Sequence, residues 1–304
     1  MPTSSRNSAQ HRFASITAGA IALAVSVALT SCATQPANDT AASPMLPAAT
    51  TPAPAVAEAV PEIRPGVLAG YLGRDLPNSL ALLPAPPKEG SVAFKNDQAV
   101  SRASQKLRAT ARGTQATSDA DLAFPHVAGV FSCALGVPVS QAGSPRLYQL
   151  LRRTMTDAGL ATYAAKDHYK RTRPFVFYKE DTCAPKDEAA LRNDGSYPSG
   201  HTSIGWMWAL VLTQVAPDRA DALLARGRSF GESRLVCNAH WQSDILAGRT
   251  IASGTFAKVQ SNATYRADVA AAAQEMQALR AGGQAAVDCD AEAAALAIPI
   301  DGVQ

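Results

Sequence analysis

Residues 195–215 read GSYPSGHTSIGWMWALVLTQV, and this stretch decides the fold. From Ser203 to Val215 it is almost wholly apolar, which predicts a helix that is buried on most of its sides. The residues before it place glycine, proline, serine and a histidine at the expected helix start. Backbone N–H groups at a helix start, next to a glycine that permits close approach, can bind an anion. We therefore expect a turn followed by a helix that Thr202 or Ser203 caps. The same segment can also bind an anion.

The segments on either side of this stretch also favour helices. Alternating runs of β-branched residues, which would indicate strands, are missing. From residue 62 to 304 some 240 residues remain, enough for one domain with a sizeable core. The sequence thus predicts an all-α, single-domain helical bundle over residues 62–304, with further helical segments at 91–121, 145–170, 218–236, 243–260 and 264–280.

A basic segment precedes the central stretch. It reads KDHYKRTRP from Lys166 to Pro174. Lys166, Lys170 and Arg173 are spaced by four and three residues, which predicts one face of a helix. Pro174 disfavours helix at the preceding residue, so we expect Arg173 at the helix end, where its side chain can turn inward. Taken alone, this segment also fits a solvated basic face.

A third segment follows the central stretch and reads SRLVCNAHWQSD from Ser233 to Asp244. His240 and Asp244 are four residues apart, so the carboxylate can reach the imidazole if this part is helical. Such a contact fixes the tautomer of a histidine and stabilises its charged form. Arg234 adds a cation. A lone structural histidine near a helix start is the alternative interpretation.

The N-terminus has the pattern of an export signal. Arg6 and Arg12 precede an uncharged run of 17 residues, 13–29, and small residues follow it. The sequence Leu-Thr-Ser-Cys that ends at Cys32 resembles the bacterial lipobox, in which the cysteine carries lipid. We expect a lipoprotein signal peptide at 1–31, lipidation of Cys32, and a disordered Ala/Pro/Thr-rich tether at 32–61. The protein would then be periplasmic and anchored by lipid to a bacterial membrane, either the outer or the inner one. A plain signal peptide with a chance cysteine is the alternative.

The remaining composition excludes several classes of protein. Removal of residues 1–31 takes away two arginines and no acidic residue, which lowers the net charge from +3 to +1. This charge gives no basis for nucleic-acid binding. No H-E-x-x-H or C-x-x-C motif indicates zinc. Asp119 and Asp121 form a D-x-D pattern, but polar residues precede it instead of an apolar strand. We interpret it as part of a polar helix or loop.

Together, the three segments resemble the signature of the type 2 phosphatidic acid phosphatase (PAP2) superfamily, K-x6-R-P, P-S-G-H and S-R-x5-H-x3-D. Every motif position matches, and the resemblance extends from about Tyr71 to Met276. The context of Gly195-Ser196-Tyr197 is similar to that of the class A bacterial non-specific acid phosphatases. The resemblance implies the helical bundle that this superfamily shares with vanadium haloperoxidases. It also implies broad hydrolysis of phosphate monoesters, with a possible phosphotransferase side activity and possible homo-oligomers.

The resemblance also implies a role for each motif residue. His240, oriented by Asp244, would attack phosphorus and form a phosphohistidine. His201 would protonate the leaving alkoxide and then activate water, which favours a mildly acidic optimum if both histidines titrate near their ordinary pKa of about 6.5. The cations would replace a metal or other cofactor, and the expected phosphate-binding residues are Lys166, Arg173, Ser199, Gly200 and Arg234.

Two other functions stay open at this point. A vanadium haloperoxidase would hold vanadate with the same residues. A catalytically silent surface lipoprotein would use the pocket only to bind phosphorylated ligands, although such a protein would need neither His201 nor His240. A membrane lipid phosphatase would need several spanning helices, and no run after Leu29 is long enough.

Besides Cys32, four cysteines follow the expected cleavage site, an even number that favours two disulfides in an exported protein. Convergence of the three motifs on one phosphate would bring Cys183 close to Cys237, and related acid phosphatases hold cysteines at these positions. We therefore expect a Cys183–Cys237 bridge, which leaves Cys133 for Cys289. Four free buried thiols are the alternative.

Overall fold

The computed structural model describes residues 60–283 and 287–303. The expected signal peptide, the lipidated Cys32 and nearly all of the tether lie outside these residues. The described part is helical apart from one short antiparallel pair of strands. Its elements are β1 (Glu62–Arg64), β2 (Val67–Leu68), α1 (Ser79–Leu82), α2 (Val92–Gln105), α3 (Ala111–Ala120), α4 (Ser132–Leu135), α5 (Pro145–Leu160), α6 (Tyr163–Tyr169), α7 (Pro174–Tyr178), α8 (Glu188–Asn193), α9 (Gly200–Val215), α10 (Ala220–Val236), α11 (Gln242–Val259), α12 (Ala263–Ala281) and α13 (Asp290–Leu296).

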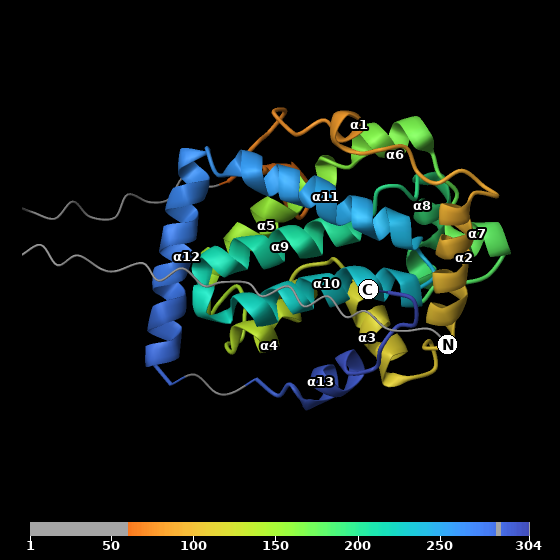
Figure 1. Ribbon diagram of the computed structural model, residues 1–304. Helices are drawn as coiled ribbons and strands as arrows, with labels where there is room; N and C mark the ends of the chain where they lie inside the picture. The colour runs from red at the N-terminus through yellow and green to blue at the C-terminus, as the bar shows by residue number, and fades with distance from the viewer. Residues whose placement is uncertain (1–59, 284–286, 304) are drawn as a thin grey trace, which may run out of the picture. The chain divides into compact units, whose positions relative to one another are not determined.

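The apolar helix that the sequence predicts is α9, and it lies at the centre of the bundle. α10 and α11 run beside it, and α5 packs against it as well (Figure 1). Trp208 and Met207 on α9 are fully buried in the main core. Gly227 on α10 lets the two helices approach, because a Cβ at this position would overlap Ala209 of α9. The expected all-α fold is confirmed.

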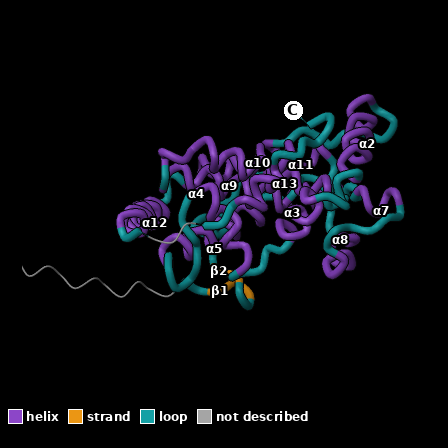
Figure 2. Tube along the Cα trace, turned by 90° about the horizontal axis from the view of Figure 1, so that it is seen from below, coloured by secondary structure: helices purple, strands orange, loops and turns teal. Residues whose placement is uncertain are grey.

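Other elements cover the edges of this centre. α12 packs across α5 and α9, and Figure 2 shows the β1–β2 pair beside α5. Tyr71 follows the pair and its backbone N–H donates to Oδ2 of Asp157 on α5 at 2.8 Å, which fixes the strands to the bundle. None of the described helices is both long and apolar enough to cross a membrane.

Two local expectations were wrong. The helix expected over 91–121 is broken into α2 and α3. Ser199, rather than Thr202 or Ser203, caps α9: its Oγ accepts from the N–H of Thr202 at 3.2 Å. Asp119 lies in the polar helix α3, in agreement with the expected polar helix or loop, but its side chain is fully buried and accepts from the guanidinium of Arg226 at 2.6 Å.

Two disulfides cross-link the bundle. Cys183 is bonded to Cys237 and Cys133 to Cys289, the two pairs that we expected. The first joins the loop after α7 to the end of α10. The second ties the segment before α13 to α4.

Candidate active site

The basic segment does not form the single helical face that we expected. α6 ends at Tyr169, and Lys170 adopts a left-handed conformation with a φ of 41°. Arg173 is then the N-cap residue of α7 rather than the last residue of a helix, because Pro174 is suited to the first helical position. Lys170 is exposed, whereas Lys166 and Arg173 are both buried. The turn therefore brings the two motif cations together without the helical spacing.

These two cations share one carboxylate. Oδ2 of Asp194 accepts from Nζ of Lys166 at 3.1 Å and from Nη2 of Arg173 at 2.9 Å. Lys166 also donates to the carbonyl of Gly195 at 2.5 Å. A side chain at Gly195 would come within 2.6 Å of the carbonyl oxygen of Lys166, so the close approach requires glycine here. Burial and the charge of Arg173 lower the pKa of Lys166 to about 8.

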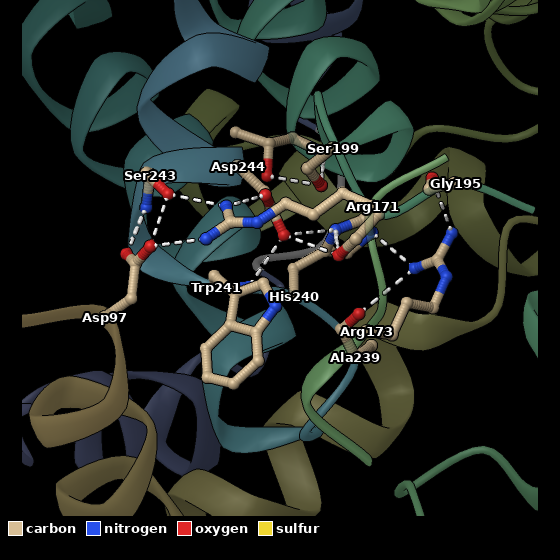
Figure 3. A network of polar contacts seen from close by, with 12 residues as sticks. Asp97, Arg171, Arg173, Gly195, Ser199, Ala239, His240, Trp241, Ser243 and Asp244 are labelled. Atoms are coloured by element: carbon tan, nitrogen blue, oxygen red, sulfur yellow. Dashed lines mark hydrogen bonds and ion pairs between the residues drawn. The ribbon is translucent and has the colours of Figure 1, made fainter. Parts of the chain in front are cut away.

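His240 lies against Arg173 (Figure 3). Nη1 of Arg173 is 2.9 Å from Nε2 of His240. A guanidinium can only donate hydrogen bonds, so Nε2 is the acceptor and the ring proton of the neutral histidine is on Nδ1. Nδ1 faces Oδ2 of Asp244 at 3.4 Å and Oγ of Ser196 at the same distance. This tautomer leaves a lone pair on Nε2, which is what a nucleophile requires.

A polar network holds Asp244 in place (Figure 3). Its Oδ2 accepts from Oγ of Ser196 at 2.5 Å and from the backbone N–H of Trp241 at 2.8 Å. Its Oδ1 accepts from Nη1 of Arg171 at 2.5 Å. The other branch of the guanidinium donates to Asp97 on α2 at 2.7 Å. The carboxylate that faces His240 is thus fixed from both sides.

His201 lies on the first turn of α9. Its Nε2 is 3.0 Å from the carbonyl oxygen of Ala120. Because a carbonyl only accepts, Nε2 carries a proton, and any second proton of a charged His201 is on Nδ1. Lys166, Arg173, Gly200, His201 and His240 all line one cavity of about 550 Å³.

Arg234 is fully buried near the end of α10. Its Nη1 is 3.7 Å from the sulfur of Cys237, whereas its Nε and Nη2 have no partner among the described residues. A buried guanidinium with unpaired N–H groups is costly, and a bound anion would satisfy it. Burial and the charge of Arg173 lower the pKa of Arg234 to about 9.

The pKa values of the two histidines differ from those that we expected. Burial and the neighbouring cations hold the pKa of both histidines well below the ordinary value: Arg173, Lys166 and Arg234 act on His240, and Arg234 acts most strongly on His201. Two histidines that titrate near 6.5 were expected. Both rings are therefore neutral at a pH equal to their ordinary pKa of about 6.5.

Ser199, an expected phosphate-binding residue, forms the cap of α9 in the structure. Its buried hydroxyl oxygen accepts from the N–H and the hydroxyl of Thr202, at 3.2 and 2.9 Å, and it does not line the cavity. Its own proton is still available to an anion, but capping α9 accounts for the side chain.

Sequence reasoning missed several residues of this site. Asp194 directly precedes the stretch 195–215 and Ser196 is its second residue, so their position before the P-S-G-H motif was the available signal. Arg171 lies within the first motif, between two residues that we did interpret. Asp97 gave no signal, because it lies 74 residues before Arg171 in the chain.

The chain resembles known proteins over most of the described part. The model of the PAP2 superfamily matches residues 150–266. The non-specific acid phosphatase of Providencia stuartii is 48% identical over 204 residues, which are 67% of this chain and 82% of that protein. The chain belongs to the PAP2 superfamily, among the class A acid phosphatases. The non-specific acid phosphatase of Salmonella typhimurium is 39% identical over 66% of this chain and 80% of its own length. The acid phosphatase of Zymomonas mobilis is 39% identical over 66% of this chain and 76% of its length.

Proposed function

We propose that this acid phosphatase hydrolyses phosphate monoesters in two steps, by transferring the phosphoryl group to Nε2 of His240 and then to water. The observation that supports this best is the pairing of an acceptor Nε2 with the Arg173 guanidinium at 2.9 Å. A phosphoryl group that binds Arg173 takes over this donor and meets the lone pair of Nε2. The bond from phosphorus to the ester oxygen breaks as the bond to nitrogen forms.

The cations stabilise the transferred group. Lys166, Arg173 and Arg234 together offset the charge of a phosphate dianion and its transition state. Two nitrogens of Arg234, Nε and Nη2, have no partner in the described part of the chain. We propose that these three cations do the work that a metal does in other phosphatases. The described residues include no group of three His, Cys, Asp or Glu side chains that could hold a metal ion.

His201 then serves as acid and base. When charged, its Nδ1 proton passes to the leaving alkoxide, and the neutral ring afterwards takes a proton from the water that attacks the phosphohistidine. The carbonyl of Ala120 holds the ring through Nε2 in both steps.

Turnover of p-nitrophenyl phosphate in excess EDTA tests the proposal. We expect unchanged activity in EDTA and competitive inhibition by vanadate, which can become five-coordinate like the transition state. Loss of activity in EDTA would refute the metal-free mechanism. Oxidation of halide by peroxide in the presence of vanadate, without phosphatase activity, would favour a haloperoxidase instead.

We also propose that the chain is exported and anchored by lipid on Cys32. The two disulfides support an oxidising compartment. Labelling of growing cells with radioactive palmitate tests this, with Cys32→Ser as the control. We expect label on the unchanged chain alone and release of Cys32→Ser from the membrane fraction. Equal membrane retention of both would contradict lipidation.

A further inference from the structure

Apolar side chains gather at the mouth of the catalytic cavity. Eight large apolar side chains in the described residues are exposed, and three of them, Ile63, Leu160 and Tyr163, line this one cavity. They come from β1, the end of α5 and the start of α6. Exposed apolar side chains scattered singly are normal, whereas a cluster marks a binding surface.

The same wall continues into the cavity with Val67, Leu122, Met155 and Ile204. We use the term apolar wall for these four residues together with Ile63, Leu160 and Tyr163. It ends at the phosphate-binding cations and His201. The apolar wall therefore lies where the alcohol part of a bound phosphate monoester must lie.

The two threonines that line the cavity beside the apolar wall already donate their hydroxyl protons within the protein. Thr156 donates through Oγ1 to the carbonyl of Leu68 at 2.8 Å. Thr162 donates through Oγ1 to the carbonyl of Gly159 at 2.7 Å. Neither has a proton left for a substrate hydroxyl. Apart from the catalytic residues and Asp194, the remaining polar groups of the lining are the exposed Arg64 at the rim and the single phenol hydroxyl of Tyr163.

We propose that the apolar wall binds the alcohol part of the substrate, and that this enzyme prefers monoesters of apolar alkyl or aryl alcohols over sugar phosphates. The inference rests on the proposed function and adds the substrate class to it. A sugar in this position would lose its hydrogen bonds to water and find few in return. An alkyl or aryl group would instead remove apolar surface from water.

The expected effect is a dependence on chain length. Complete burial of one methylene group corresponds to about fourfold in affinity. Because this cavity is open on one side, we expect a two- to fourfold gain per methylene. These contacts are made equally in the ground state and the transition state, so the gain appears in KM and leaves kcat unchanged.

The test uses the full-length chain and n-alkylphosphonates from methyl to hexyl, which cannot be hydrolysed. Calorimetry gives their dissociation constants, and we expect a steady decrease with chain length together with a more negative heat capacity of binding. Galactose 6-phosphate and hexyl phosphate are then compared as substrates, with the lower KM expected for hexyl phosphate. Equal affinity for methyl- and hexylphosphonate overturns the proposal. The same result is expected if another segment or a second copy covers the wall.

Variants locate the effect. Leu160→Ser and Tyr163→Ser change side chains that are 41% and 47% exposed, so the fold is expected to persist. Leu246→Ser is the matched control, because Leu246 is 49% exposed on α11 and does not line the cavity. We expect the two wall variants to lose part of the chain-length dependence while their affinity for methylphosphonate stays the same. A dependence that is unchanged in both wall variants refutes the assignment to these residues.

The phosphonate measurement separates this inference from the proposed function. A chain that binds hexylphosphonate more tightly than methylphosphonate but hydrolyses neither p-nitrophenyl phosphate nor hexyl phosphate supports the apolar wall and refutes the proposed hydrolysis. A chain that hydrolyses both esters but shows no dependence on chain length keeps the proposed function and overturns the inference.

Discussion

Arg171 donates to Asp244 through Nη1 at 2.5 Å, and both side chains are buried. Through Nη2 the same guanidinium reaches Asp97, whose other contacts are the hydroxyl and the backbone N–H of Ser243, at 2.6 and 2.8 Å. The orientation of the carboxylate beside His240 therefore depends on a residue in α2. Arg171 is a positioning residue, since it acts on the nucleophile only through Asp244.

Replacement of Arg171 by lysine tests this role. Arg171→Lys keeps a positive charge, but an ammonium group cannot reproduce the planar fork that binds two carboxylates. We expect kcat to fall about 10- to 100-fold because the nucleophile is misplaced, while KM changes less than about twofold. We also expect the acid limb of the pH–rate profile to move, since the surroundings of His240 change.

Arg102→Lys is the matched control. The guanidinium of Arg102 also binds a carboxylate through two nitrogens, which donate to Glu180 at 2.7 and 2.9 Å, but it does not contact Asp244. We expect its kcat to match that of the unchanged enzyme. Equal losses of activity in both variants, or loss of thermal stability alone in Arg171→Lys, would show that Arg171 is merely structural.

Replacement of His240 and replacement of His201 should affect activity differently. His240→Ala removes the nucleophile and should abolish turnover. His201→Ala should retain slow transfer to His240, with a loss of about 10²- to 10⁴-fold for alkyl phosphates and less for p-nitrophenyl phosphate, whose leaving group needs little protonation. Rapid acid-labile 32P labelling of His201→Ala, with none on His240→Ala, is the expected result. Acid-stable label on serine would be incompatible with the nucleophile assigned here.

Anion binding should be coupled to proton uptake. Burial and the cations lower the pKa of His201 in the empty site, so at about pH 6.5 the ring is neutral there. A bound dianion offsets these cations and raises this pKa, so His201 gains a proton and affinity falls as pH rises. Lys166, with a pKa of about 8, is already charged at this pH and contributes little.

Calorimetry with sulfate measures this uptake, because sulfate itself does not titrate in this range. Binding heats in two buffers of different ionisation enthalpy give the number of protons. We expect uptake of up to one proton in the unchanged enzyme and less in His201→Ala. Binding without proton exchange at about pH 6.5 would rule out His201 as the group that is charged by the substrate.

The sequence predicted the elements that depend on local patterns. The apolar run that ends at Val215 could only be a buried helix, and α9 has that character. Its start was misplaced by three residues, because serine or threonine occupies three of the five positions 199–203 and any of them could cap the helix. The turn at Lys170 was missed because a left-handed lysine has no signal in the residue type.

Distant partners explain the other differences. The burial of Asp119 was not predicted, because its neighbours in the chain are polar and its counter-ion Arg226 lies 107 residues away. Asp97 and Arg171 are likewise paired although they are 74 residues apart in the chain. A buried charge is stabilised by a partner that only the tertiary structure supplies. The motif residues could be found because their spacing is fixed along the chain.

The two disulfides should differ in their effect on catalysis. Cys237 of the Cys183–Cys237 bridge lies within the third motif. The N–H of Cys183 donates to the carbonyl of Cys237 at 3.2 Å, and the sulfur of Cys237 lies 3.7 Å from Nη1 of Arg234. Cys133–Cys289 instead holds the segment before α13, away from the cavity that contains both histidines. The first bridge therefore positions Arg234, for which we propose phosphate binding, and the second restrains the C-terminal segment.

Paired serine variants separate the two bridges. The sequence separations are 54 and 156 residues, so the loop-closure model gives upper values of about 4 and about 5 kcal/mol for the loss of stability. We expect Cys133→Ser/Cys289→Ser to lower the urea midpoint while kcat stays within about twofold. Cys183→Ser/Cys237→Ser should lower both the midpoint and kcat, the latter about tenfold, because Arg234 loses its restraint. Full activity in the folded Cys183→Ser/Cys237→Ser variant would show that this bridge has no part in the site.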